Sequence, residues 1–297
     1  MAFWQLTVPI SSETSEGLTN FLWEQGALGV VEEESPGAPP RLRAFFADAR
    51  SSTALLGAVN GYRDSLRALG FPADAGDAEI SPLHDEAWAS AWQQSFPARP
   101  VGRRLLVLPP WLDGAATAAA RADGDRLAVV IEPGRAFGTG HHGTTEGCLT
   151  LLEETLAAAP DASVLDVGTG TGILAIAALR LGVRSVLAID VDPDAVAATR
   201  ANATRNGYPG LSVRLAEAGD VSDRFTVVLA NLLTHTHLSL AGHYARLVAP
   251  GGHLVLGGML DGEDDRVARA LSGHGFAPRS RLALEGWASL RLDAAAR

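Results

Sequence analysis

The stretch Val164–Ile173 reads V-L-D-V-G-T-G-T-G-I and decides the fold class of this chain. Apolar strand residues run into Asp166, glycines follow at positions 168, 170 and 172, and the helix-like run Ile173–Leu181 begins at once. A strand that enters a helix through closely spaced glycines is typical of the ligand-binding turn of a parallel α/β sheet. The next predicted strand, Ser185–Ile189, ends on Asp190, about twenty residues beyond the first glycine, where a carboxylate can bind both ribose hydroxyls. The sequence therefore predicts a site for a nucleoside-containing ligand.

The spacing of the glycines favours S-adenosylmethionine over a dinucleotide. The dinucleotide fingerprint G-x-G-x-x-G requires glycine at position 173, which is isoleucine here. Gly168 and Gly170 stand before a helix whose N-terminus offers unpaired N–H groups and a positive dipole end to a methionine carboxylate. Asp166 can attract the amino group of the ligand or a nearby water. A glycine-rich turn that binds nothing is the structural alternative, and Asp190 in register counts against it.

Composition and charge narrow the function classes. The chain has 297 residues and a formal net charge of −10, which disfavours direct nucleic-acid binding because phosphate neutralisation needs clustered basic side chains. This charge suits a basic protein partner or a cationic ligand. No apolar run is long enough for a membrane span and the N-terminus shows no leader pattern, so we expect a cytoplasmic protein without a membrane partner. Cys148 is the only cysteine, and neither a disulfide nor a structural metal site is expected.

The first part of the chain is predicted to be a small domain followed by a linker. Residues 1–82 alternate in the order strand, helix, strand, strand, helix, strand, which is the order of a ferredoxin-like α+β sandwich. Residues 83–100 are expected to contain a linker helix with Trp88 and Trp92 on one face, where buried packing is favoured over a cofactor-binding role.

The remaining residues, 101–297, are predicted to form the cofactor domain. Leu105–Pro109 and Leu127–Glu132 are expected to pair as a hairpin that leads into it. From about residue 144, helices and strands alternate, which indicates a doubly wound, Rossmann-like, mostly parallel α/β sheet. The strand-like run Arg281–Leu292 is expected to supply an antiparallel edge.

Two further segments are predicted to contribute to the site. The glycine-rich loop P-G-R-A-F-G-T-G-H-H-G-T-T ends at Thr145; Thr144 or Thr145 is expected to cap the next helix, and Phe137 to lie against the sulfonium or the adenine. The adjacent histidines of this loop lack an acidic or cysteine ligand at a suitable spacing, so no metal is predicted. Asn231 follows an apolar strand in A-N-L-L-T and falls on the edge of the sheet where such folds bind ligands. Its carboxamide oxygen can accept a hydrogen bond from an incoming amine, which makes Asn231 the predicted catalytic residue.

These motifs together resemble the PrmA family of ribosomal protein methyltransferases, class I enzymes that modify large-subunit ribosomal protein L-eleven. The resemblance rests on D-E-A-W-A-S-A-W-Q-Q-S-F-P, E-P-G-R-A-F-G-T-G-H-H-G-T-T, D-V-G-T-G-T-G-I and A-N-L-L, within residues of about 85 to 275. It implies methylation of amino groups, on lysine side chains and/or the N-terminal amine, by an enzyme whose mobile N-terminal domain grips the substrate. We expect the enzyme to be a monomer. The resemblance also implies cofactor contacts from Thr145, Gly168, Asp190 and Asn231.

The chain departs from the family pattern at two positions. Thr169 stands where cysteine is frequent, and Gly143 stands where proline is frequent. We expect both departures to soften the local geometry without removing a contact.

Three other functions remain open at this point. A related methyltransferase of a lysine or glutamine side chain is one, although glutamine-directed relatives carry N-P-P-Y where this chain has N-L-L-T. A non-catalytic S-adenosylmethionine-binding factor for ribosome assembly is another. A nicotinamide oxidoreductase is disfavoured by the glycine spacing.

Overall fold

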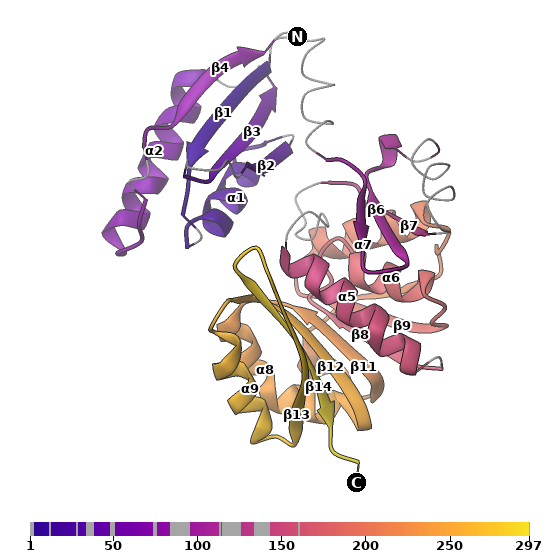
Figure 1. Cartoon of the computed structure of the whole chain (residues 1–297). Coiled ribbons are helices and arrows are strands. Elements are labelled where there is room, and N and C mark those ends of the chain that lie inside the picture. The colour runs from indigo at the N-terminus through magenta and orange to yellow at the C-terminus, as the bar shows by residue number, and fades with distance from the viewer. Residues whose placement is uncertain are drawn as a thin grey trace. The chain divides into compact units, whose positions relative to one another are not determined.

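The computed structural model of this chain divides into two compact units, Met1–Pro97 and Ala98–Arg297 (Figure 1). It describes residues 3–11, 13–27, 29–33, 39–47, 51–73, 76–83, 96–112, 114, 126–133, 143–159 and 161–296. The predicted packing of Trp88 and Trp92 lies outside these residues, as does the predicted ligand contact of Phe137. Within the described ranges, no helix combines the length and the apolar character that a membrane crossing requires.

The first unit is a four-stranded antiparallel sheet with two helices. Its strands lie in the order β2-β3-β1-β4, which is the ferredoxin-like arrangement that the sequence predicts. Leu6 and Val8 alternate inward on β1 and pack with Leu18 and Leu22, which are one helical turn apart on α1. The elements are β1 (Phe3–Pro9), α1 (Ser15–Glu24), β2 (Gly29–Glu33), β3 (Arg41–Ala47), α2 (Ser52–Ala68) and β4 (Glu79–Leu83).

The second unit is built on a seven-stranded sheet in the order β10-β9-β8-β11-β12-β14-β13. Parallel pairing joins the strands from β10 to β12, whereas β14 pairs antiparallel with both β12 and β13. This arrangement confirms the predicted doubly wound α/β sheet. The elements are α5 (Gly143–Ala158), β8 (Ser163–Val167), α6 (Ile173–Arg180), β9 (Ser185–Asp190), α7 (Pro193–Arg205), β10 (Ser212–Leu215), β11 (Phe225–Asn231), α8 (Thr234–Leu247), β12 (Val248–Leu260), α9 (Asp264–Ser272), β13 (Phe276–Leu284) and β14 (Trp287–Ala294).

Both faces of this sheet are covered by helices (Figure 1). Side chains alternate across a strand, so Val227 and Leu229 of β11 pack with α5, α6 and α7, whereas Val228 and Ala230 pack with α8 and α9. Because both sets are buried, the strand reads as a continuous apolar run in the sequence. The two cores fix the register of β11 and therefore the position of Asn231 at its end.

The predicted hairpin of Leu105–Pro109 and Leu127–Glu132 is wrong. The strands β6 (Leu105–Leu108) and β7 (Leu127–Val130) pair in parallel, and β5 (Arg99–Val101) supplies the antiparallel neighbour of β6. The intervening chain is long enough to return to the starting end of β6, as a parallel pair requires, whereas hairpins favour short connections.

The predicted antiparallel edge is also wrong in its placement. The run Arg281–Leu292 contains parts of two strands, joined by a turn at Glu285 and Gly286, whose φ angles are +52° and +77°. Two central residues of positive φ are typical of a type I′ hairpin turn. The antiparallel strand β14 lies inside the sheet, and β13 forms the edge.

One ion pair ties α9 to this edge and gives a stability prediction. Arg281 donates from Nε to Asp264 Oδ2 at 2.6 Å and from Nη2 to Oδ1 at 3.1 Å. These bonds hold the pKa of the buried Asp264 carboxyl below its ordinary value. A carboxyl whose pKa is lower when folded adds stability above its unfolded pKa of about 3.9 and loses it as the pH falls.

We expect Arg281→Gln to lower the melting temperature at pH 7 by about 2–5 °C, because about 1–2 kcal/mol of charge-assisted bonding is lost. The deficit relative to the parent should shrink between pH 5 and pH 3, measured by thermal circular dichroism. Arg279→Gln is the matched control, since the Arg279 side chain is 67% exposed and pairs with Asp293. A deficit in melting temperature of the same size at pH 5 and at pH 3 would contradict this assignment.

Candidate active site

The glycine loop between β8 and α6 has the conformation that its sequence requires. Gly168, Gly170 and Gly172 have φ angles of +69°, +55° and +83°, which residues with a Cβ atom rarely adopt. A Cβ at Gly172 would lie 2.8 Å from the Cγ2 atom of Thr199 on α7, so the third glycine allows close helix packing. The other two glycines shape the turn itself.

Asp190 holds this loop from the end of β9. Its Oδ2 accepts a hydrogen bond from the Gly170 N–H at 2.9 Å, and its Oδ1 accepts one from the Asp192 N–H at 3.0 Å. A carboxylate has about four acceptor positions, so both oxygens retain lone pairs for ribose hydroxyls. The glycine loop and Asp190, which the sequence predicts to lie at one ligand-binding edge, are therefore in direct contact.

Asp166 lies beneath the loop and is almost completely buried. Its Oδ2 accepts from the Thr169 hydroxyl at 2.7 Å and from the Ala175 N–H at 3.2 Å. Burial raises the pKa of this carboxyl to about 7. Its Oδ1 has no hydrogen-bond partner among the described residues, which leaves a buried acceptor beside the loop.

Asn231 ends β11, and its carboxamide is held by two threonines of α5. The Thr144 hydroxyl donates to Asn231 Oδ1 at 2.8 Å, and Asn231 Nδ2 donates to the Thr145 hydroxyl at 3.4 Å. Both threonines are fully buried and follow Gly143, the first residue of α5. The prediction that one of them caps this helix is therefore wrong, because both lie within its first turn and Thr144 is directed at Asn231.

The glycine loop and the Asn231 segment lie in contact. A Cβ at Gly168 would lie 2.5 Å from the Cδ2 atom of Leu232. The parallel register places Val167 beside both Ile189 of β9 and Ala230 of β11. The predicted residues Gly168, Gly170, Asp190, Asn231, Thr145 and Asp166 are thus gathered at the carboxyl ends of three adjacent strands, where open α/β sheets bind ligands.

Two residues of this edge were not predicted from the sequence. Val191 follows Asp190 and is 69% exposed, and Leu215, the register partner of Asp190 on β10, is 58% exposed. Exposed apolar side chains beside the carboxylate that the sequence predicts to bind ribose offer a surface for a flat heterocycle. An apolar residue directly after the carboxylate was the available signal for Val191, but Leu215 becomes a neighbour only through strand pairing.

The two departures from the family pattern have specific contacts. Thr169 donates the hydrogen bond to Asp166 described above. At Gly143 a Cβ would lie 2.6 Å from the backbone oxygen of Leu284, so glycine allows α5 to approach β13 closely. Glycine at this position therefore has a packing role in addition to the expected softening of the local geometry.

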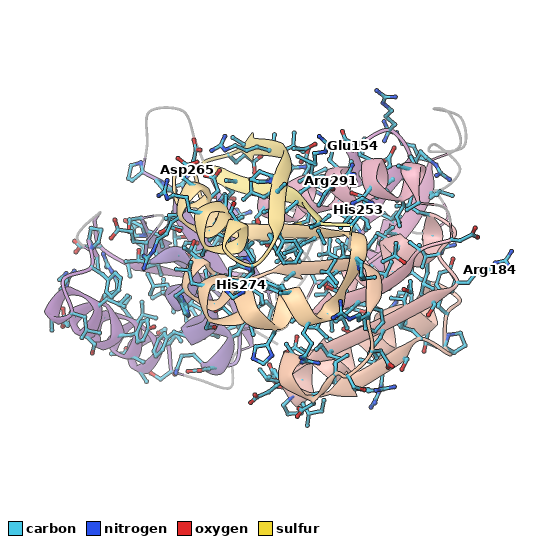
Figure 2. The ribbon with its side chains drawn as sticks, turned by 90° about the horizontal axis from the view of Figure 1, so that it is seen from below. Glu154, Arg184, His253, Asp265, His274 and Arg291 are labelled. Carbon is cyan, nitrogen blue, oxygen red and sulfur yellow. The ribbon has the colours of Figure 1, made fainter. Side chains whose placement is uncertain are left out.

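A second polar cluster lies toward the other end of the sheet. His253 of β12 bonds Asp293 of β14 at 2.8 Å, and Arg291 lies 3.4 Å from Asp293. Figure 2 labels His253 and Arg291. His253 is four residues before Gly257, the register partner of Asn231. Across the ranges that the structure describes, no group of three or more His, Cys, Asp or Glu residues is arranged to hold a metal ion. The loop histidines 141 and 142 lie outside those ranges.

The strand order, the glycine loop and the carboxylate on the neighbouring strand define a class I, S-adenosylmethionine-dependent methyltransferase. The family model described as ribosomal protein L11 methyltransferase (PrmA) matches residues 2–294. The chain belongs to this family, and it is an enzyme of the protein methyltransferase class.

Individual relatives agree with this assignment. A ribosomal protein L11 methyltransferase of Geobacter metallireducens is 40% identical over 74% of this chain and 70% of its own length. One of Methylococcus capsulatus is 34% identical over 96% of this chain and 97% of its own length. The crystal structure of a ribosomal protein L11 methylase from Lactobacillus delbrueckii subsp. bulgaricus aligns with a TM-score of 0.61 and 28% identity, over 67% of this chain and all of that one.

Proposed function

We propose that this chain transfers methyl groups from S-adenosylmethionine to amino groups of ribosomal protein L11, on lysine side chains and/or the N-terminal amine. The observation that carries the proposal is the meeting of the glycine loop, Asp190 and the Asn231 segment at one edge of the sheet. The family model and its relatives name the substrate of the homologous enzymes.

The residues present fit the methyl donor. Gly168 and Gly170 form a turn without side chains, and the buried Asp166 Oδ1 is an acceptor beside that turn, suited to an ammonium group. Asp190 would bind the ribose hydroxyls, and the exposed Val191 and Leu215 would pack on the adenine. When bound, S-adenosylmethionine supplies a methyl group carried on a positively charged sulfur. Thr145 and Phe137 are proposed as further contacts, the first through the carboxamide that it bonds.

Asn231 is the residue we propose to orient the acceptor. The Thr144 hydroxyl occupies one lone pair of Asn231 Oδ1. The second lone pair is left to accept an N–H of the incoming amine. A lysine amine has a reference pKa of about 10.4, and burial beside a cation favours its neutral form through desolvation and like-charge repulsion. Holding the nitrogen in line with the methyl group would then supply most of the acceleration, because proximity contributes several kcal/mol.

The first unit is proposed to recognise the substrate. Residues 1–97 contain 13 acidic residues and five arginines, whereas residues 98–297 are nearly balanced, with 21 acidic residues and 19 arginines. Most of the net negative charge of the chain therefore belongs to the first unit. A net negative unit attracts a basic protein and repels nucleic acid. We propose residues 1–82 as this substrate-recognition domain, 83–100 as the linker region that contains the predicted helix, and 101–297 as the methyltransferase domain of a cytoplasmic monomer.

Incubation with methyl-tritiated S-adenosylmethionine and purified L11 tests the proposal. We expect label in L11, and acid hydrolysis should assign it to methylated lysine or to the methylated α-amine. A reaction that lacks the enzyme should give no label. Label in a glutamine amide would favour the related glutamine methyltransferase. Cofactor binding without transfer would instead favour a non-catalytic assembly factor, and light scattering of the same sample tests the monomer.

A further inference from the structure

A single peptide group lies behind the Asn231 carboxamide. Between Leu256 and Met259 the pairing of β12 with β14 shifts register, and Gly258 adopts a φ angle of +81°. A Cβ at Gly258 would lie 2.3 Å from the backbone oxygen of Leu232, so only glycine fits there. The bulge turns the peptide that joins Gly257 to Gly258 so that its two polar atoms serve different partners.

The carbonyl oxygen of this peptide accepts a hydrogen bond from a side chain of α8. The Gly257 oxygen accepts from His237 Nε2 at 2.7 Å and from the Leu232 N–H at 3.1 Å. His237 is fully buried, and burial lowers its pKa to about 4, so the ring is neutral near pH 7. Because a carbonyl can only accept, the ring proton is on Nε2. Nδ1 then accepts from the hydroxyl of Tyr244, which lies 3.0 Å away and is itself fully buried.

The N–H of the same peptide extends this series of hydrogen bonds toward Asn231. Gly258 N–H donates a hydrogen bond to the Thr144 hydroxyl, and that hydroxyl donates onward to Asn231 Oδ1 at 2.8 Å. Asn231 Nδ2 in turn donates to the Thr145 hydroxyl. From Tyr244 to Asn231, every donor therefore points in the same direction, and aligned hydrogen bonds polarise one another.

We propose that Tyr244, His237 and Thr144 form a buried positioning relay, through the Gly257–Gly258 peptide, that fixes which end of the Asn231 carboxamide is oxygen. The two ends of a carboxamide are nearly equal in size, so packing alone distinguishes them poorly. An acceptor amine that donates its N–H needs the oxygen end. The effect on methyl transfer rests on the proposed function, whereas the effect on the carboxamide does not.

Thr144→Val is the sharpest kinetic test, because it keeps the shape of the side chain and removes the hydroxyl. We expect kcat for methylation of L11 to fall about tenfold, with the KM for S-adenosylmethionine within about threefold of the parent. Thr144→Ser should restore most of kcat, since serine keeps the hydroxyl. Tyr244→Phe, which removes only the first donor, should lower kcat by a smaller factor.

Thr155→Val is the matched control. Thr155 is also fully buried on α5, but its hydroxyl bonds Leu151 O in its own helix at 2.6 Å. This variant should keep the parent kcat, and thermal melts of all variants report any loss of folding. Equal kcat losses in the two valine variants, or no rescue by serine, would overturn the relay.

A spectroscopic readout separates the relay from the proposed function. The chain has only five asparagines, so selective ¹⁵N-asparagine labelling gives five side-chain NH₂ pairs, and loss of one pair in Asn231→Ala assigns Asn231. Thr144→Val and Tyr244→Phe should shift this pair or double it through amide flipping, and Thr155→Val should leave it in place. An unmoved pair in Thr144→Val overturns the relay. A moved pair in a protein that never labels L11 supports the relay and refutes the proposed function.

Discussion

Asn231→Ala is expected to lower kcat by about 10²- to 10³-fold, the loss typical of removing one preorganised polar group at a reacting centre. The variant removes the oxygen that we propose to orient the acceptor amine. The glycine loop and Asp190, which form most of the proposed donor site, contain no atom of the Asn231 side chain, and Asn231 adds at most one of several donor contacts. The Kd for S-adenosylmethionine should therefore change by less than about fivefold, measured by calorimetry beside steady-state kinetics.

The control for this prediction is Asn60→Ala, an exposed position on α2 of the first unit. It should match the parent in kcat, in donor binding and in melting temperature. Asn231→Ala should also remain folded, because its partly exposed side chain gives up only the bonds to Thr144 and Thr145. Parent-like turnover in Asn231→Ala would remove Asn231 from the mechanism.

The edge of the sheet could be predicted because it depends on local patterns and one general rule. An apolar run followed by Asp190 or by Asn231 marks where a buried strand ends, and parallel strands bring their carboxyl ends to one edge. The glycines at 168, 170 and 172 likewise indicate a turn with positive φ angles, because glycine adopts such angles without strain. These inferences need no knowledge of which strands are neighbours beyond the fold class.

The relay could not be predicted, because it consists of contacts between distant parts of the chain. Thr144 and Gly258 are 114 positions apart in the sequence, and Gly258 lies at a register shift in the pairing of β12 with β14 that the sequence does not show. A histidine inside α8 resembles any buried polar residue until its partner is known. The same cause explains the misplaced edge strand, since the short Glu285–Gly286 turn was hidden within an alternating pattern.

The two sides of the site therefore depend on different kinds of interaction. The proposed donor side is set by backbone conformation and by one carboxylate, Asp190, that bonds the loop directly. The proposed acceptor side depends on Asn231, whose carboxamide is bound by α5 and, through the relay, by α8. Mutations on the two sides should consequently separate donor affinity from turnover.

Asp190→Ala is expected to weaken S-adenosylmethionine binding by about 10- to 150-fold in Kd, which corresponds to about 1.5–3 kcal/mol for hydrogen bonds to a charged group. Two losses combine in this variant. The ribose hydroxyls lose their proposed carboxylate, and the Gly170 N–H loses the acceptor that holds the loop. At saturating donor, kcat should stay within about fivefold of the parent, because Asn231 and its threonine partners are unchanged.

Asp190→Asn separates the two losses, since its amide oxygen can still accept from Gly170 while the negative charge is gone. Its Kd should fall between those of the parent and Asp190→Ala if loop support and ribose binding both contribute. Asp223→Ala, an exposed carboxylate in the loop before β11, is the matched control and should bind the donor like the parent. A drop in kcat at saturating donor as large as that of Asn231→Ala, with unchanged Kd, would place Asp190 on the acceptor side and reverse the assignment of the two sides.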